Sequence, residues 1–480
     1  MAQPVALGST QTQRLTMTED LTWMPAWRIR ELIAKSEVSP VEVTEHFLGR
    51  IEALEPRLHA FRQIDAAGAR DQARRAEQAV RAGEDLGPLH GIPVALKEHI
   101  PIKGLKTIAF GAATPSIAPH DDICTERLRK AGAVIVGSTV MPGMGNYAPA
   151  SRVGLTSDLS RHPRNPWDET RVPGSSSAGG AAATAAAMLP MTIGSDGGGS
   201  TRLPASLCGV IGVHPSRGRI PYVNYDSPML MTTVTFGPIT RDARDAAVAM
   251  QALAGADGRD LICIQEPAPD YLGGLDRGVE GMRLAWTDDF GFADMYALGE
   301  TPRVIETVRK AALSLAGQGA SVEPVADVWE DFWTGYFTTN LVYLNVTPPP
   351  GTPKPTIEQV QAAFETRARN YQHFDDLLSK YDLLLSPTIQ FTAFTVEGWD
   401  AAWNRDGANY PHGTFAPTYT SDTHMFNWLG WPAVSVPCGF VDGLPVGLQI
   451  IGRPRDEPKI LRAAAAFMKA NPLTRRPPVS

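Results

Sequence analysis

One stretch of the chain, residues 174–209, constrains the fold more than any other. It has three consecutive serines at its start, a run of three glycines followed by Ser200 near its end, and an alanine-rich run between the two. Side chains this small allow a helix over residues 178–188 to pack closely on a sheet. Glycines beside a serine also let backbone N–H groups converge, as an oxyanion hole requires. Hydrolysis is therefore the first hypothesis.

Helical and strand patterns alternate along the rest of the chain. Ser39, Pro40 and Glu42 supply an N-cap, a first-turn proline and a capping-box acid, which predict the start of a helix. This alternation is typical of the α/β class, with a mixed central sheet covered by helices on both faces. Further helices are predicted at residues 66–82 and 124–130, and strands at 92–96, 133–136, 191–194, 381–385, 434–436 and 448–451.

A segment rich in large aromatic residues interrupts this alternation. It runs from residue 329 to 343 and is followed by prolines at 348–350, which predicts an irregular insertion. The sequence contains no internal repeat and no clear domain linker. We therefore expect an N-terminal extension at residues 1–24 and a single domain at 25–475, with N-terminal helices in 25–82 and a substrate-shaping insertion at about 325–420.

Charge and composition exclude several function classes. Lys and Arg number 44 against 51 Asp and Glu, and no long basic block is present, so a nucleic-acid partner is not expected. Residues 1–24 lack the pattern of a signal peptide, and no apolar run is long enough to span a membrane. The four cysteines lie far apart and predict neither a zinc site nor a disulfide framework. We expect a cytoplasmic protein with no metal and no cofactor.

A serine nucleophile needs a base within hydrogen-bond reach. The ten histidines show no pattern relative to the serines, and no Gly-x-Ser-x-Gly motif is present. Lys97 is the alternative, because it follows the apolar run 92–96 and burial favours the neutral amine. Most lysines are exposed, however, so the local sequence alone favours a lysine that emerges into solvent.

The wider pattern resembles the amidase signature family, and the resemblance covers nearly the whole chain. Gly-Ile-Pro-Val-Ala-Leu-Lys-Glu, which contains Lys97, is similar to the lysine strand of that family. The other similar segments are 164–168, 174–177, 194–202, 382–388, 430–437 and 443–452.

The resemblance implies the amidase signature fold and a role for each matched residue. Ser200 is expected to be the nucleophile, Ser176 a proton relay on a cis peptide bond, and Lys97 the base. The oxyanion hole would be formed by the N–H groups of Gly197, Gly198, Gly199 and Ser200. Asp196 and Arg202 are expected to orient the glycine turn by hydrogen bonds, and Ser177 is expected to lie next to the catalytic groups as a cap or packing residue.

The substrate is expected to be a bulky hydrophobic or aryl amide, with possible hydrolysis of esters. Methionine and aromatic side chains offer adaptable apolar walls, although they equally fit an insertion that packs on the core. Within the aromatic segment these are Trp329, Phe332, Trp333, Tyr336, Phe337 and Tyr343. The candidates for the pocket are Met141, Met144, Tyr147, Trp333, Tyr336 and Phe337.

Several alternatives stay open. One is a carbamate (urethane) hydrolase of the same family. Another is the transamidation subunit of a glutamyl-tRNA amidotransferase complex, but residues 214–219 depart from the lysine-proline-threonine run that is usual there. A third is a binding protein without activity, which the presence of Lys97, Ser176 and Ser200 disfavours. The expected partner is a small amide, ester or carbamate, and a homodimer stays open.

Overall fold

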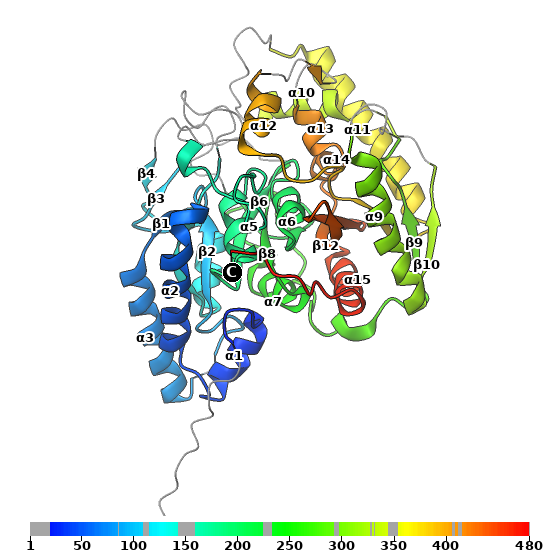
Figure 1. The fold of residues 1–480 in the computed structure, drawn as a ribbon. Helices are drawn as coiled ribbons and strands as arrows, with labels where there is room; N and C mark the ends of the chain where they lie inside the picture. The colour runs from blue at the N-terminus through cyan, green and yellow to red at the C-terminus, as the bar shows by residue number, and fades with distance from the viewer. Residues whose placement is uncertain are drawn as a thin grey trace, which may run out of the picture.

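The frame of the molecule is an 11-stranded sheet with the order β1-β5-β2-β6-β8-β7-β12-β13-β11-β9-β10 (Figure 1). The computed structural model describes residues 20–84, 86–108, 115–142, 159–223, 233–291, 297–326, 329–330, 332–343, 354–405, 409–410 and 415–479. Parallel pairs β5–β2–β6 and β11–β9–β10 flank an antiparallel centre. The mixed sheet predicted from the sequence is confirmed.

The elements have the following bounds. The strands of the large sheet are β1 (Phe61–Ile64), β2 (Pro93–Lys97), β5 (Val134–Thr139), β6 (Met191–Asp196), β7 (Ile211–His214), β8 (Thr235–Thr240), β9 (Arg283–Trp286), β10 (Ser321–Pro324), β11 (Leu383–Pro387), β12 (Ala433–Val441) and β13 (Leu444–Ile451). A separate small pair is formed by β3 (Lys106–Thr107) and β4 (Ser116–Ile117). The helices that bear on the argument are α1 (Ala26–Ala34), α2 (Pro40–Leu58), α3 (Ala66–Ala82), α4 (Ile123–Lys130), α5 (Ala178–Ala185), α6 (Arg202–Cys208), α7 (Ala243–Leu253), α9 (Thr301–Leu313), α10 (Trp333–Tyr343), α11 (Ile357–Leu378), α12 (Val396–Asp400), α13 (Ala416–Thr420), α14 (His424–Leu429) and α15 (Glu457–Ala470).

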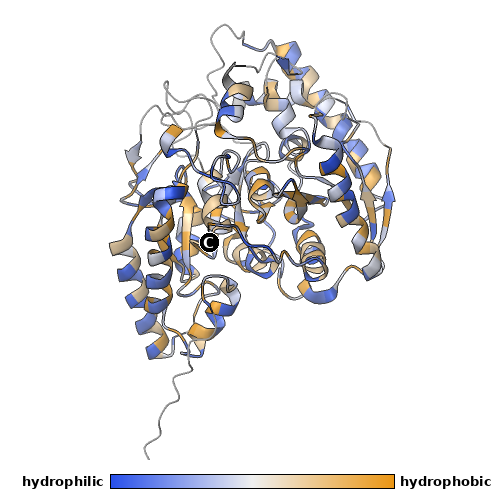
Figure 2. Ribbon diagram, in the orientation of Figure 1, coloured by the Kyte–Doolittle hydropathy of each residue, from blue (hydrophilic) through white to orange (hydrophobic). Residues whose placement is uncertain are grey.

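Local sequence signals account for much of this arrangement. The capping box at the start of α2 is present, with Glu42 N donating to Ser39 Oγ (3.0 Å) and Ser39 N donating to Glu42 Oε2 (2.8 Å). Helix α3 has the predicted bounds, and the predicted strands match observed ones to within a few residues. Hydrophilic and hydrophobic residues alternate along α2 and α3 (Figure 2), whereas residues 93–96 of β2 are apolar and buried.

Helix α5 is completely buried, which explains its small side chains. A Cβ at Gly179 would collide with the carbonyl oxygen of Ala60, and one at Gly180 would lie 3.0 Å from Thr192 Oγ1. Glycine and alanine therefore let the helix lie directly against β6.

The last two strands that the structure describes, β12 and β13, lie in the interior of the sheet. β12 and β13 lie between β7 and β11. β12 pairs with β7 and β13 pairs with β11, so this C-terminal hairpin joins the two halves of the sheet. Helix α15, at the C-terminal end, and helix α9 pack on the same strands. The hydrophobic core is continuous across the two halves through this hairpin.

The aromatic segment differs from its predicted form. Residues 333–343 form helix α10 rather than irregular structure, and helices α10 to α14 gather on one side of the sheet (Figure 1). Trp329 and Phe332 are buried against Phe374 and Trp428, so these two aromatics belong to the core.

In the part of the chain that the structure describes, no helix is long and apolar enough to cross a membrane.

Candidate active site

Lys97 is completely buried at the carboxyl end of β2. Its Nζ donates to Ser176 Oγ (2.7 Å), to Ser195 Oγ (3.0 Å) and to Ser195 O (3.2 Å). Strands β2 and β6 run parallel, with Leu96 opposite Ile193, so Lys97 and Ser195 emerge at the same edge of the sheet. The sheet register therefore places the amine among hydroxyl groups.

Burial lowers the pKa of Lys97 from 10.5 to about 7, although the nearby carboxylates of Asp196 and Glu98 act in the opposite direction. A substantial fraction of the amine is therefore neutral at physiological pH. The Glu98 carboxylate accepts hydrogen bonds from Arg62 Nε (2.6 Å) and from Met141 N (2.6 Å). A neutral amine beside Ser176 Oγ is able to accept a proton from that hydroxyl.

The serine turn that precedes α5 is fixed from two sides. The peptide bond between Ser175 and Ser176 is cis, as the resemblance implied. Tyr419 OH donates to Ser175 O (2.6 Å) and accepts from Ser175 N (2.7 Å). Ser177 N donates to Ser200 O (3.1 Å), and Ser177 Oγ donates to Ser195 O (3.3 Å). The serine turn and the glycine turn are thus in direct contact.

The glycine turn wraps around the carboxylate of Asp196. Gly199 N donates to Asp196 Oδ1 (2.7 Å), and the N–H groups of Thr201 and Arg202 both donate to Asp196 Oδ2 (3.2 Å each). The prediction of four oxyanion donors is therefore wrong for Gly199, because a carboxylate already occupies its N–H. Gly197, Gly198 and Ser200 stay as predicted donors.

Asp196 and Arg202 form a buried ion pair beneath this turn. Both side chains have 0% exposure, and Arg202 Nε lies 3.0 Å from Asp196 Oδ2. Arg202 also donates to Gln449 Oε1 (2.7 Å) and Asn427 Oδ1 (2.5 Å). Burial alone would raise the pKa of Asp196, but Arg202, His214 and Asn427 hold that pKa well below its usual range. Asp196 is therefore a permanent anion at neutral pH.

Two hydroxyl groups from distant helices reach the carbonyls of the glycine turn. Tyr336 OH, on α10, donates to Gly197 O (2.7 Å). Thr423 Oγ1, just before α14, donates to Gly198 O (2.8 Å). The group of helices above the sheet thus contacts the turn that carries the candidate nucleophile.

Sequence reasoning missed the residues whose contacts depend on tertiary structure. Ser195 belongs to the glycine-rich signature itself, and pairing the predicted strands 92–96 and 191–194 in parallel could have indicated its place beside Lys97. No local signal identifies the others, because their partners lie more than 200 residues away in the chain. These are Tyr419, Thr423, Asn427 and Gln449.

The predicted pocket residues fall into three groups. Met141 is buried with an exposed fraction of 4%, and Met144 and Tyr147 lie outside the described residues. Trp333, Tyr336 and Phe337 are half-buried on α10, and the rings of Trp333 and Phe337 stack with centroids 5.8 Å apart. Aromatic surface is thus available on the helix whose Tyr336 touches the glycine turn.

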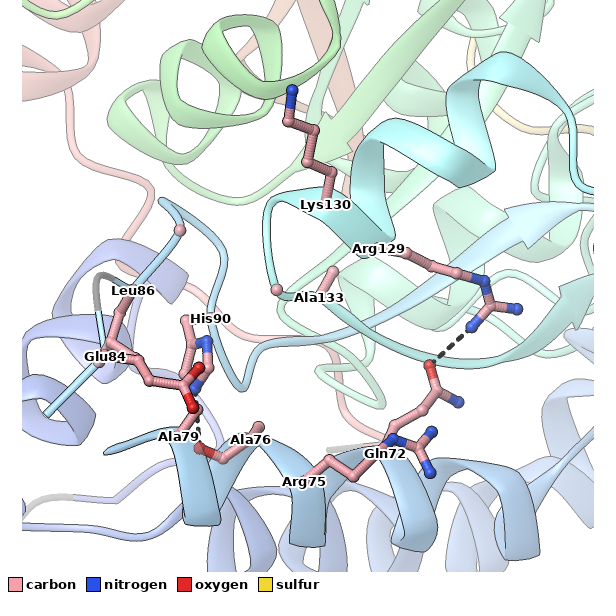
Figure 3. A pocket seen from close by; sticks show the side chains of 12 residues that line it. Gln72, Arg75, Ala76, Ala79, Glu84, Leu86, His90, Arg129, Lys130 and Ala133 are labelled. Carbon is pink, nitrogen blue, oxygen red and sulfur yellow. Dashed lines mark hydrogen bonds between the residues drawn. The ribbon is translucent and has the colours of Figure 1, made fainter. Parts of the chain in front are cut away.

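A polar pocket of about 400 Å³ lies away from these residues (Figure 3). Its lining includes Gln72, Arg75, His90 and Arg129, from α3 and from the segments that lead into β2 and β5. It therefore lies at the amino ends of these strands, whereas Lys97 lies at the carboxyl end of β2. The pocket contains none of the predicted site residues.

The chain is similar to known proteins over most of its length. A family model described as Amidase matches residues 42–338 and 353–461. The chain is 34% identical over 491 residues to a glutamyl-tRNA(Gln) amidotransferase subunit of Synechococcus sp. (strain WH7803), covering 92% of this chain and 96% of that protein. It is 30% identical over 486 residues to an acylamidase of Rhodococcus erythropolis, covering 96% of this chain and 98% of that protein.

A solved structure is also similar over nearly the whole length of the chain. A bacterial aryl acylamidase of the amidase signature enzymes superposes with a TM-score of 0.80 at 26% sequence identity. The match covers 94% of this chain and 97% of that one. The similarity thus includes both halves of the sheet.

Proposed function

The chain belongs to the amidase signature family and is an amide hydrolase, and we propose that it works through an acyl-enzyme on Ser200 with Ser176 and Lys97 as its proton relay. The observation that carries this proposal is the 2.7 Å contact between Lys97 Nζ and Ser176 Oγ inside a buried site. The pKa of Lys97, lowered to about 7 by burial, supports the role of a base near neutral pH.

The first half-reaction forms a covalent intermediate. Neutral Lys97 accepts the proton of Ser176 as Ser176 accepts that of Ser200, and Ser200 Oγ bonds to the acyl carbon. The carbonyl π electrons move to the acyl oxygen, which the N–H groups of Gly197, Gly198 and Ser200 stabilise. The relay then runs in reverse and protonates the nitrogen of the leaving amine as the C–N bond breaks.

The second half-reaction returns the enzyme to its starting state. Water loses a proton to the same relay and attacks the acyl carbon, and the bond to Ser200 Oγ breaks. Ser200 recovers its proton and the carboxylic acid leaves. The buried anion Asp196 does not exchange protons in this scheme, and it holds the backbone of the turn through Gly199 and Thr201.

The proposed substrates are bulky hydrophobic or aryl amides. The half-buried rings of Trp333 and Phe337 supply aromatic surface on α10. Two relatives support the same substrate class, since one is an acylamidase and another is an aryl acylamidase. Aryl esters and aryl carbamates share the aryl group and the acyl carbon, so slower hydrolysis of either is consistent with this site.

Transamidation is the second candidate. It is favoured by the 34% identity to a glutamyl-tRNA(Gln) amidotransferase subunit. Such a chain works together with partner proteins, so in isolation it would hydrolyse simple amides poorly. The two candidates therefore differ in what the purified protein does alone.

One experiment separates the candidates. Hydrolysis rates of the purified chain are measured on matched aryl anilides, alkyl amides, aryl esters, aryl carbamates and glutamine. We expect anilides to give the highest kcat/KM among the amides. A preference for small alkyl amides would contradict the proposal of aryl substrates. A preference for carbamates would favour urethane hydrolysis. Hydrolysis of glutamine and of no other substrate in the set would favour transamidation.

A further inference from the structure

We propose that Tyr336 is a positioning residue for the oxyanion hole, in addition to any contact that its ring makes with substrate. Tyr336 OH donates to Gly197 O (2.7 Å). Through this bond, Tyr336 directs the N–H group of Gly198 toward the acyl oxygen of a substrate attacked by Ser200. The inference rests on the proposed acyl-enzyme mechanism.

The effect follows from the rigidity of the peptide unit. Gly197 C=O and Gly198 N–H belong to one planar group, and in a trans peptide they point in opposite directions. A hydrogen bond to Gly197 O therefore fixes the direction of Gly198 N–H on the other side. The same bond polarises the peptide and makes its N–H a stronger donor.

The peptide between Gly198 and Gly199 is restrained at both ends, whereas the described residues restrain the peptide between Gly197 and Gly198 at its carbonyl oxygen only. Thr423 Oγ1 donates to Gly198 O, and Gly199 N donates to Asp196 Oδ1. Among the described residues, the structure records no hydrogen-bond acceptor for Gly198 N–H. Tyr336 is therefore the side-chain restraint on a peptide between two residues that lack side chains.

The tyrosine hydroxyl lies almost on top of the glycine backbone. A Cβ at Gly198 would come within 2.6 Å of Tyr336 OH, so only glycine permits this approach. The ring is held by His424 (centroids 5.2 Å apart) and Trp333 (5.8 Å). Burial raises the pKa of Tyr336 above its usual value, and the hydroxyl therefore stays protonated and able to donate.

The test is Tyr336→Phe, which removes one hydroxyl and keeps the ring. We expect kcat to fall about tenfold to a hundredfold with KM nearly unchanged, somewhat less than the loss of an oxyanion donor itself. The matched control is Tyr371→Phe, since Tyr371 is 42% exposed on α11 and its variant should keep wild-type kcat. Thermal melting of both variants checks that the fold is intact.

A second readout does not depend on the amide substrate. A fluorophosphonate probe forms an O–P bond with Ser200 as the P–F bond breaks, the proton passes to the relay, and the phosphoryl oxygen lies where the acyl oxygen would. We expect Tyr336→Phe to slow this labelling by a factor similar to the loss in kcat.

The outcomes distinguish the possible roles. A raised KM with unchanged kcat and unchanged labelling would make Tyr336 a pocket wall and overturn the inference, as would wild-type values throughout. If the wild-type protein hydrolyses no amide but Ser200 is labelled, the proposed function fails, and the labelling rates still decide the role of Tyr336. Absence of labelling in the wild type would overturn both.

Discussion

Lys97 and Ser176 lie 79 positions apart in the chain, yet Lys97 Nζ and Ser176 Oγ are separated by only 2.7 Å in a site closed to solvent. One residue comes from the end of a strand and the other from the turn before a buried helix. A charged amine would be poorly solvated here, and the same burial makes the neutral amine accessible near pH 7.

Lys97→Ala should lower kcat/KM for an anilide by about 10² to 10⁴ at pH 7, because it removes the proposed general base. Partial recovery is expected at high pH, where hydroxide replaces the amine. Steady-state kinetics at pH 7 and pH 9.5 measure both effects. The control is Lys380→Ala, which removes an exposed lysine. Near-normal activity of Lys97→Ala at pH 7 would exclude lysine as the base.

The pH profile of the wild-type enzyme should follow the amine. Burial lowers the pKa of Lys97 to about 7, and only the neutral form accepts a proton, so kcat/KM should rise through about pH 7 and level off above it. The protonated amine at lower pH is inactive. A profile that is flat from pH 5 to pH 9 would be incompatible with this mechanism.

Ser200→Ala should abolish turnover and covalent labelling together, because the acyl group has no oxygen to which it can bond. Intact-mass measurement after treatment with a fluorophosphonate checks this directly. Ser206→Ala serves as a control, since that buried serine lies within α6 and has no role in the proposed mechanism. A phosphonylated Ser200→Ala protein would show that another residue is the nucleophile.

Asp196→Asn should destabilise the fold as well as slow the reaction. It leaves the Arg202 guanidinium buried without its counter-ion, which costs about 3–5 kcal/mol. Urea unfolding of the variant measures the change in the free energy of unfolding. Glu330→Gln is the comparison, because its ion pair with Arg369 lies at the surface and its loss should change stability little. Equal effects of the two substitutions would refute the assigned role of Asp196.

Local sequence patterns predicted a large part of the fold. The capping box of Ser39 and Glu42 predicted the start of α2, and the apolar run before Lys97 predicted β2, because both depend on residues close together in the chain. Resemblance to a family then reversed the local expectation for Lys97, which is buried rather than exposed.

Local sequence patterns did not predict features that depend on contacts between residues far apart in the chain. Six aromatics and nearby prolines indicated irregular structure at 329–343, yet α10 forms there because its partners in α11 and α14 bury one side of it. The contact between Tyr336 and Gly197 spans 139 positions and follows from no periodicity in the sequence. Likewise, the family resemblance implied that Gly199 is an oxyanion donor, whereas its N–H donates to Asp196 Oδ1 in the structure.

The place of the C-terminal hairpin also bears on how the molecule is made. Because β12 and β13 lie between β7 and β11, the facing edges of β7 and β11 stay unpaired until this hairpin is in place. Gln449, which receives a hydrogen bond from Arg202, arrives with that same hairpin. A chain that stops before residue 433 would lack both strands and Gln449, and we expect it to be inactive and prone to aggregate through the unpaired edges of β7 and β11.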